Sequence, residues 1–588
     1  MTGRPAEDAV LPPPPFPEWR LPTLPDPEII QRLVRELSLP PSICSILAVR
    51  DLTDPSRAKQ FLRPRLEDLH PPSDMKDLDL AVERILSAVK ARETILVHGD
   101  YDVDGVCAAA LLTLWVRRLG GTVVPFVPHR LRDGYDLGSA GVRAAVEAGA
   151  SLIVTCDSGI GAHEAIKEAE RQELEVIVTD HHLPFGGLPP ALAVVNPNRS
   201  DCTYPAPQLC GTGVVFKLCQ GLASAANIPQ DELWPHLDLV ALATVADLVP
   251  LTGENRILVR FGLRYLANTT KFGLRALIRV AGLDTQSGLE AGDVGFVLGP
   301  RINAVGRMGE ADLALQLLLT ADLSEAHRLS EILERANHER REEDRATLDE
   351  ALKYLSNEFD SARDFGVVLS GENWHPGVIG IVASRLVQRI HRPVVLVALD
   401  GDRGRGSARS IPGVHLLRAV EAGRRHLTRF GGHSQAAGLE LDRKDLPSFR
   451  SAFNESVRNQ LQGRFPQPRV GGDQELALAE ANDDLHSLLR HMGPFGIGNP
   501  RPVFWARGLR VVRAPKVVGG GHLKLRLGDG SHELEAIGFG LADRVPPTSV
   551  GTGRMDMLFQ LRQNVFRGKR TLQARLLDLR PTGDLEGG

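Results

Sequence analysis

The chain has 588 residues, with 69 Lys and Arg against 73 Asp and Glu, and a net charge of −4. Apolar residues make up 43 %, and the longest uncharged apolar runs fall short of the roughly 18 residues that a membrane helix needs. Membrane-spanning, collagen-like and wholly disordered architectures are therefore excluded, and at roughly 150 residues per domain the length predicts about four domains.

The beginning of the chain, MTGRPAEDAVLPPPPF, has no basic-then-apolar leader, so we expect a cytoplasmic protein. The six cysteines form no CxxC pair and no zinc-ligand spacing, which predicts reduced core residues. Charge is distributed unevenly, because the segment from Arg501 to the end has 15 Lys and Arg against 8 Asp and Glu. The last segment is thus the electropositive part.

Residues 1–50 are predicted to be an N-terminal arm. From Thr94, short β-branched runs alternate with helix-length segments (TILVHGD, SLIVTCDSG and EVIVTDHH are the strands), which predicts a parallel sheet with crossover helices in a domain at 51–320. A charged stretch without Pro or Gly predicts a long connecting helix over 321–360, and a second, smaller α/β domain is expected at 361–462. Five short alternating strands in 463–588 predict a small barrel of the OB type. The fold class is therefore α/β with a C-terminal β-barrel.

Polar residues follow several of these strands directly. His98-Gly99-Asp100-Tyr101-Asp102-Val103-Asp104 comes after TILV, Asp157 after LIVTC, Asp180-His181-His182 after VIVT, and Asp247 after the helical run LVALATVA. A single Asp at a strand end is usually a turn former or helix cap, and a lone His-His pair is usually surface or packing. In combination they would repel one another on one sheet edge unless cations were bound.

Mixed Asp and His donors favour Mn²⁺ first and Mg²⁺ second over a structural zinc site, which would use thiolates. Two such ions are a recurrent device for phosphoester hydrolysis. The residues thus predict a centre of two divalent cations with phosphodiesterase chemistry.

Four motifs, HGDYDVDG, TCDSG, TDHH and ATVADLVPL, resemble in this order those of the DHH phosphoesterase superfamily, and GGHSQAAG resembles the glycine-rich motif of its DHHA1 domain. NPNRSDCTYPAPQLCGTGVVFKL, GPRINAVGRM and GPFGIGNPRPVF narrow the resemblance to the RecJ family of single-stranded-DNA-specific 5′→3′ exonucleases, which act in recombination and repair. The resemblance spans roughly Asp51 to Leu579.

The resemblance implies a division of the ligands between two ions. His98, Asp102 and Asp157 would hold one, and Asp104, Asp157, His181 and Asp247 the other, so that Asp157 bridges. His182 would face the scissile phosphate, and Asp180 would orient an imidazole. Spacing alone does not fix which of His181 and His182 is the ligand. The residues expected to be catalytic are Asp104, Asp157, Asp180 and His182.

Phosphate-binding residues are expected in two places. GPRINAVGRM offers Arg301, Asn303 and Arg307, although an ordinary surface loop is the alternative. The second α/β domain offers Ser407, Arg409, Gly432 and His433, which we expect to capture the 5′-terminal phosphate.

The basic barrel is expected to hold the strand farther from the cut through Arg562, Phe566, Arg567 and Lys569, while ordinary barrel residues with solubilising charge are the alternative. Single-stranded DNA would enter between the two α/β lobes and leave as 5′-mononucleotides. A single-strand-binding protein and a RecQ-type helicase are the candidate partners, with no membrane involved. Two other functions stay open: a phosphodiesterase for short oligonucleotides or cyclic dinucleotides, and a noncatalytic DNA-binding scaffold.

Overall fold

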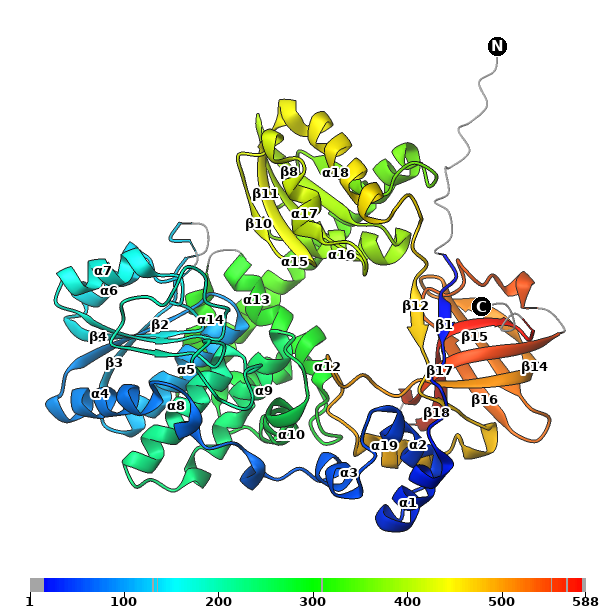
Figure 1. Cartoon of the computed structure of the whole chain (residues 1–588), viewed down its shortest axis with the longest axis horizontal. Coiled ribbons are helices and arrows are strands. Elements are labelled where there is room, and N and C mark those ends of the chain that lie inside the picture. Colours follow the sequence, from blue (N-terminus) through cyan, green and yellow to red (C-terminus); the bar gives the residue numbers. More distant parts are fainter. Residues whose placement is uncertain are drawn as a thin grey trace. The chain divides into compact units, whose positions relative to one another are not determined.

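The computed structural model describes residues 15–129, 132–134, 136–307, 310–550, 553–566 and 569–583, without the side chains of 307, 565, 566 and 569. The chain forms two compact units. The parallel-sheet unit comprises residues 60–339 and 492–501, and the barrel unit comprises the chain up to 59, 340–491 and the segment from 502 onward. Each unit is described by itself below, and its elements can be followed in Figure 1.

The parallel-sheet unit is built on five parallel strands in the order β3-β2-β4-β5-β6. These strands are β2 (Thr94–Gly99), β3 (Thr122–Phe126), β4 (Ala150–Cys156), β5 (Glu175–Thr179) and β6 (Ala193–Val195). The inner strands β2, β4 and β5 are buried almost throughout because helices cover both faces. This confirms the predicted sheet with crossover helices.

Helices α6 (Ser139–Glu147) and α7 (His163–Arg171) cover one face of the sheet, and their core includes Leu96, Ile153 and Val178. Helices α4 (Leu78–Ala91), α5 (Val103–Arg118) and α8 (Gly211–Ala225) pack on the other face (Figure 1). Helix α5 is buried along nearly its whole length, because α8 and α9 (Leu237–Ala246) enclose it. The carboxyl ends of the strands therefore lie at one fixed edge.

The rest of this unit is helical. It contains α10 (Gly253–Ala267), α11 (Phe272–Val280), α12 (Ala291–Asp293), a π-helical turn η5 (Val294–Leu298), α13 (Gly299–Arg307) and α14 (Ala311–Leu319). The 36-residue helix α15 (Leu323–Glu358) continues into the barrel unit and confirms the predicted long connecting helix.

The barrel unit begins with a mixed sheet of five strands in the order β10-β11-β9-β8-β7, in which only β7 and β8 are parallel. The strands are β7 (Val367–Gly371), β8 (Val394–Asp400), β9 (Arg403–Arg409), β10 (Arg429–Gly432) and β11 (Ala436–Asp442). Helices α16 (Ile379–Ile390), α17 (Leu416–Glu421) and α18 (Leu446–Gln460) pack against it. The second α/β fold is thus confirmed.

The C-terminal strands close into the expected barrel. They are β14 (Phe504–Val518), β15 (His522–Gly528), β16 (Glu533–Gly538), β17 (Arg554–Phe566) and β18 (Lys569–Pro581), and β14 pairs with β17 to complete the ring. The short β13 (Gln474–Glu475) adds to β14, and α19 (Asp483–Arg490) precedes the barrel.

The N-terminal segment is attached to the barrel unit, which the sequence did not predict. Strand β1 (Glu18–Arg20) pairs in parallel with β12 (Arg469–Gly471), and Trp19 Nε1 donates to Asp578 Oδ2 at 2.6 Å. Helices α1 (Pro27–Leu37), α2 (Pro41–Val49) and α3 (Pro55–Leu62) follow. A buried aromatic with a satisfied N–H holds the segment in place.

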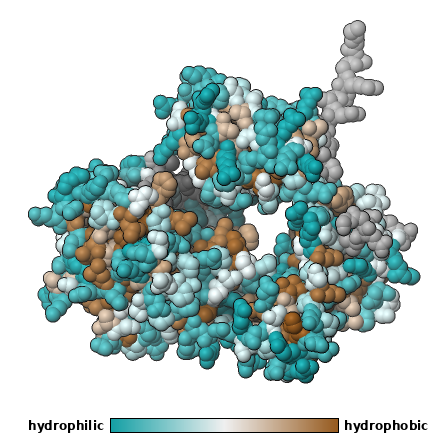
Figure 2. Space-filling model, in the orientation of Figure 1, coloured by the Kyte–Doolittle hydropathy of each residue, from teal (hydrophilic) through white to brown (hydrophobic). Residues whose placement is uncertain are grey.

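All six cysteines are free thiols and five are buried, as predicted. Hydrophilic residues cover most of the visible surface in Figure 2, and hydrophobic residues form separate patches. Among the described helices, none combines the length and apolarity required to cross a bilayer.

Candidate metal centre

The polar residues that follow the parallel strands meet at one edge of the sheet. His98 is the second-to-last residue of β2, Asp157 directly follows β4, and Asp180 directly follows β5. Asp157 has a backbone φ of +63°, and its N–H donates to the Thr179 carbonyl at 2.9 Å. A non-glycine residue held in the left-handed region is a strained position of the kind found at functional sites.

The His181 imidazole is the centre of this cluster. Its Nε2 lies 3.2 Å from Asp157 Oδ1, 3.7 Å from Asp247 Oδ2 and 3.9 Å from Asp104 Oδ2. Asp247 caps the C-terminus of α9, whereas Asp104 lies in the first turn of α5. Four elements thus bring one imidazole and three carboxylates together, at positions that the sequence analysis assigned to a single ion.

Three overlapping groups of donors have the spacing of a metal site: Asp157, His181 and His182; Asp104, His181 and Asp247; and Asp100, Asp102 and Asp157. Asp100 was not among the predicted ligands. The sequence signal that could have identified Asp100 as a ligand is its position directly after β2. In the structure its side chain is buried, at 4 % exposure. The structure therefore adds one carboxylate to the candidate set.

Helix termini fix two of the carboxylates. Asp102 is the N-cap of α5, where its Oδ1 accepts from the backbone N–H groups of Asp104 and Gly105, at 2.9 and 3.1 Å. Asp104 accepts from the first N–H groups of α8, with Gly211 N on Oδ2 and Thr212 N on Oδ1, both at 2.7 Å. The positive end of α8 thus holds a carboxylate in the interior.

Burial and mutual repulsion shift the titration of the cluster. Burial, followed by the charges of Asp104 and Asp102, raises the pKa of Asp157 well above its usual value, and the same causes raise that of Asp247 to about 8. Burial also raises the pKa of Asp102, with Asp104 as the next cause. Such a cluster is stable in ionised form only with compensating positive charge.

The predicted ligand His98 fits a cation as well. Its ring is completely buried, neither nitrogen has a hydrogen-bond partner among the described residues, and burial lowers its pKa to about 4. A buried neutral imidazole without a partner costs free energy unless one nitrogen binds a metal. Oxygen and imidazole donors together suit Mn²⁺ or Mg²⁺ better than a soft ion that prefers thiolate ligands.

The two adjacent histidines have different surroundings. His182 Nδ1 lies 2.7 Å from Asp180 Oδ1, which also accepts from the backbone N–H groups of both histidines, at 2.7 and 3.0 Å. Burial alone would lower the pKa of His182, but the hydrogen bond and charge of Asp180, with Asp247 and Asp104, raise it to about 9. The contact with Asp180 therefore favours the charged form of His182.

Further residues that the sequence analysis did not single out support the same loops. Asn196 Nδ2 donates to the carbonyl of His182 at 2.9 Å, and Asn198 Nδ2 donates to the carbonyl of His181. Asp136, with a φ of +74°, accepts from Gly159 N at 2.6 Å and so anchors the turn that follows Asp157. Only folding brings these segments together.

Residues Gly299–Arg307 of the GPRINAVGRM stretch form helix α13 and not a loop. Arg301 is 4 % exposed, and its guanidinium donates to Glu334 Oε2 and, at 2.7 Å, to the carbonyl of Val297. Asn303 is partly exposed, and the side chain of Arg307 lies outside the described residues. A Cβ on Gly306 would lie 2.6 Å from the Tyr101 carbonyl oxygen, so α13 packs directly on the loop after β2.

In the barrel unit, the predicted phosphate-binding residues lie on β9 and at the end of β10, with β11 between these two strands. Arg409 Nη1 donates to Ser407 Oγ at 3.1 Å and to the Ala408 carbonyl at 2.8 Å, and no carboxylate within the described ranges pairs with it. A Cβ on Gly380, in the first turn of α16, would lie 2.8 Å from Arg409 Nη2. Gly432 is the last residue of β10, and the exposed His433 begins the turn to β11.

Of the predicted barrel residues, Arg562 lies in β17 and is partly exposed. Phe566 and Lys569 pair across the β17–β18 hairpin, but their side chains lie outside the described part of the chain, as does Arg567 altogether. Their role in binding DNA stays a prediction.

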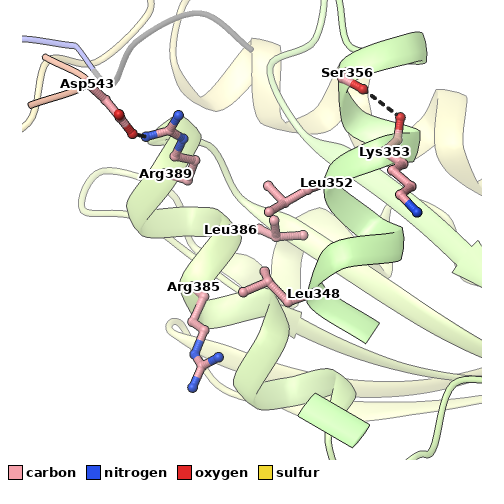
Figure 3. Close-up of a pocket in the computed structure, with 8 residues that line it drawn as sticks. All are labelled: Leu348, Leu352, Lys353, Ser356, Arg385, Leu386, Arg389 and Asp543. Carbon is pink, nitrogen blue, oxygen red and sulfur yellow. Dashed lines mark hydrogen bonds and ion pairs between the residues drawn. The ribbon is translucent and has the colours of Figure 1, made fainter. Parts of the chain in front are cut away.

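A cavity of about 560 Å³ in the barrel unit is not a catalytic site. In Figure 3, Leu348 and Leu352 of α15 point toward Leu386 of α16, and Arg389 pairs with Asp543 at 2.7 Å. The remaining lining residues are Lys353, Ser356 and Arg385. With its one carboxylate paired to Arg389, the cavity offers no metal site, so the chemistry is best sought in the parallel-sheet unit.

Comparisons with known proteins agree with this architecture. Three family models match: the DHH family, N-terminal domain, at residues 94–244, the DHHA1 domain at 364–459 and the RecJ OB domain at 472–578. The single-stranded-DNA-specific exonuclease RecJ of Escherichia coli is 38 % identical over 558 residues, which cover 91 % of this chain and 95 % of that protein.

Among solved structures, RecJ of Thermus thermophilus in complex with Mn²⁺ matches with a TM-score of 0.82 and 31 % identity, over 97 % of this chain and 80 % of the other. The same protein in complex with Mg²⁺ matches with a TM-score of 0.75 and 29 % identity, over 97 % and 79 %. This one relative has thus been solved in complex with each of the two ions that the donor set favours.

Proposed function

We propose, because the chain belongs to the RecJ family of single-stranded-DNA-specific exonucleases, that it digests single-stranded DNA in the 5′→3′ direction and releases 5′-mononucleotides in recombination and repair. The enzyme is a DHH-type metal-dependent phosphoesterase. The observation that carries the proposal is the convergence of Asp104, Asp157 and Asp247 within 3.9 Å of His181 Nε2.

Two divalent cations, with Mn²⁺ preferred, would occupy the cluster. His98, Asp102 and Asp157 would hold one, and Asp104, Asp157, His181 and Asp247 the other. Asp102 supports this assignment, because its Oδ1 is engaged by α5 and its Oδ2 remains for a cation. When bound, such ions lower the pKa of a water and neutralise charge on the phosphate.

His182 would donate to a non-bridging oxygen of the scissile phosphate. Asp180 engages Nδ1 at 2.7 Å and favours the protonated ring, in which both nitrogens are donors. Asp180 acts through His182, since its carboxylate is buried and already accepts four hydrogen bonds. We therefore assign His182 to the phosphate and Asp180 to its orientation.

The 5′-terminal phosphate would bind in the barrel unit at Ser407, Arg409, Gly432 and His433. Arg409 is the principal support, because burial lowers the pKa of a guanidinium that has only neutral acceptors within the described chain. An anion would complete its coordination, and the beginning of α16 lies against it. Asn303 and Arg307 on α13 are proposed for the strand near the cut. Arg301 is the least favoured, since Glu334 engages it.

Farther from the cut, Arg562, Phe566, Arg567 and Lys569 are proposed to track the backbone. Each lost phosphate contact lowers the slope of log affinity against log salt by about 0.7 for a single strand. Arg567→Ala with Lys569→Ala should therefore flatten the salt dependence by about 1.4. An unchanged slope of log affinity against log salt would show that the β17–β18 hairpin does not contact the DNA backbone. A single-strand-binding protein and a RecQ-type helicase are proposed as partners in the cytoplasm.

One assay tests the whole proposal. A 5′-phosphorylated strand labelled at its 3′ end, and the corresponding blunt duplex, are incubated with Mn²⁺, Mg²⁺ or chelator, and product sizes are followed over time. We expect stepwise shortening from the 5′ end on the single strand alone, with release of mononucleotides, and loss of hydrolysis in Asp157→Ala. Shortening of the duplex at the same rate, or activity in chelator, would contradict the proposal.

A further inference from the structure

Leu248 occupies an unfavourable backbone position beside the metal centre. It directly follows Asp247 and has a φ of +62°, at the position after the C-cap of α9 where glycine is usual. Its side chain is nevertheless 65 % exposed. A bulky side chain with a strained backbone and an exposed surface contributes nothing to the stability of the fold at this position. This points to a role in contact with another molecule.

The loop after the two histidines presents apolar side chains in the same way. Leu183 is 77 % exposed and Phe185 is 93 % exposed, and the backbone then turns through Gly186 and Gly187, both with positive φ. The beginning of this loop is fixed, since Asn198 and Asn196 bind the carbonyls of His181 and His182. Exposed aromatic and leucine side chains on an anchored loop form a binding surface.

The two segments begin at neighbouring points of the site. Leu248 is attached to Asp247 and Leu183 to His182, and the side chains of Asp247 and His181 approach to 3.7 Å. We define Leu183, Phe185 and Leu248 as the apolar rim. On the proposed function, the rim flanks the phosphate that is cleaved.

We propose that the apolar rim binds the unpaired nucleobases of the nucleotides that flank the scissile phosphate. The inference rests on the proposed function, because it takes the metal centre as the place of cleavage. Bases are the apolar part of a strand whose phosphates lie at the cations, and stacking on aromatic or aliphatic side chains tolerates every sequence.

A base can reach the rim only when it has left its stack and its pair. Contact with Phe185 and Leu248 would thus select single strands at the site of chemistry itself, independently of phosphate contacts elsewhere. A protein partner on the rim is the competing occupant, but it would cover the residues beside Asp247 and His181 and block the substrate. The bases of the substrate are therefore the occupant to which the geometry points.

The test compares two 5′-phosphorylated strands that differ only in their first three residues, which carry normal bases in one and abasic tetrahydrofuran units in the other. Stacking on each base changes affinity by about 5- to 150-fold. We expect kcat/KM of the unmodified enzyme to fall at least about tenfold on the abasic strand. In Leu183→Ala/Phe185→Ala/Leu248→Gly the ratio of the two kcat/KM values should fall below about twofold.

Leu80→Ala is the matched control, because Leu80 is an exposed leucine (43 %) on α4 of the same unit and should keep the full ratio. Mn²⁺ binding, followed by electron paramagnetic resonance, should be unchanged in all variants. The kcat/KM ratio is also measured for the single variants Leu248→Gly and Phe185→Ala. If one substitution disturbs the folding of its loop, the variant in the other loop still tests the inference. Equal hydrolysis of both strands by the unmodified enzyme, or an undiminished ratio in the rim variants, would overturn the inference. Failure to hydrolyse either strand would instead refute the proposed function.

Discussion

Gly211 offers a sharp test of the metal centre, because it contributes no side chain. It begins α8, and its N–H binds Asp104. A Cβ at this position would lie 2.5 Å from both Cβ and Oδ1 of Asp157, whereas ordinary contacts begin at 3.4 Å. Asp157 cannot yield easily, since it is buried, has a φ of +63° and is bonded to Thr179. Gly211→Ala must therefore displace the proposed bridging carboxylate by about 1 Å.

A misplacement of about 1 Å at a reacting group costs about 10²-fold in rate. We expect kcat/KM of Gly211→Ala on a 5′-phosphorylated single strand to fall by about that factor, with weaker binding of Mn²⁺ in calorimetry. The folded state should persist, because alanine favours a helix over glycine by about 1 kcal/mol.

Gly213→Ala is the control from the same turn. Its Cβ would meet only side-chain carbons of Leu209, at 3.3 Å or more, and the variant should keep its rate within about threefold. If Gly211→Ala also stays within threefold, the packing of Asp157 against α8 does not set the geometry of the site, and the reasoning is wrong.

Three further predictions concern the same cluster. Asp136→Ala should lower activity about tenfold, because it removes the acceptor of the Gly159 N–H. Asp136→Asn keeps an acceptor oxygen and should retain the activity. Equal losses of activity in the two variants would refute the anchoring role of Asp136. Asn198→Ala should weaken Mn²⁺ binding about tenfold by freeing the backbone of His181, and an unchanged affinity would exclude this support. In chelator, the pKa of Asp247 in the folded protein is raised from 3.8 to about 8, so the folded state keeps a proton that the unfolded chain loses near pH 4. The free energy of unfolding should therefore fall as the pH rises from 4 to 8. Mn²⁺ should therefore raise the melting temperature more at pH 8 than at pH 5, and an equal shift would contradict this cause.

The sheet and its ligand positions were predictable because they follow from local rules. Alternating buried strands and helices fix a parallel sheet, and the carboxyl ends of such strands share one edge. His98, Asp157 and the pair of His181 and His182 could thus be placed at that edge before any coordinates, whereas the choice of His181 as the ligand came from the family resemblance alone. The barrel followed from the two-residue alternation of its strands in the same way.

What the sequence could not give were hydrogen bonds between distant segments. Asn198 binds the carbonyl of His181 across 17 positions, and Asp136 reaches Gly159 across 23. Arg301 was predicted to face phosphate, but folding brings Glu334 of α15 against it. Residue type gives the chemistry that a side chain can do, and only tertiary packing decides which partner it finds.

The use of α8 bears on how the substrate is held. The N-terminus of a buried helix is a ready anion site, and a phosphate would be its ordinary ligand. In this protein a carboxylate of the chain itself occupies that site, since the two oxygens of Asp104 accept hydrogen bonds from the N–H groups of Gly211 and Thr212. On the proposed assignment, the scissile phosphate cannot use that helix end, and its charge near the sheet edge would be met by the cations and by His182. Chelation should accordingly weaken binding of a strand too short to reach beyond this edge of the sheet. Binding of that strand that is unchanged in chelator would show that the cations do not bind the cleaved phosphate.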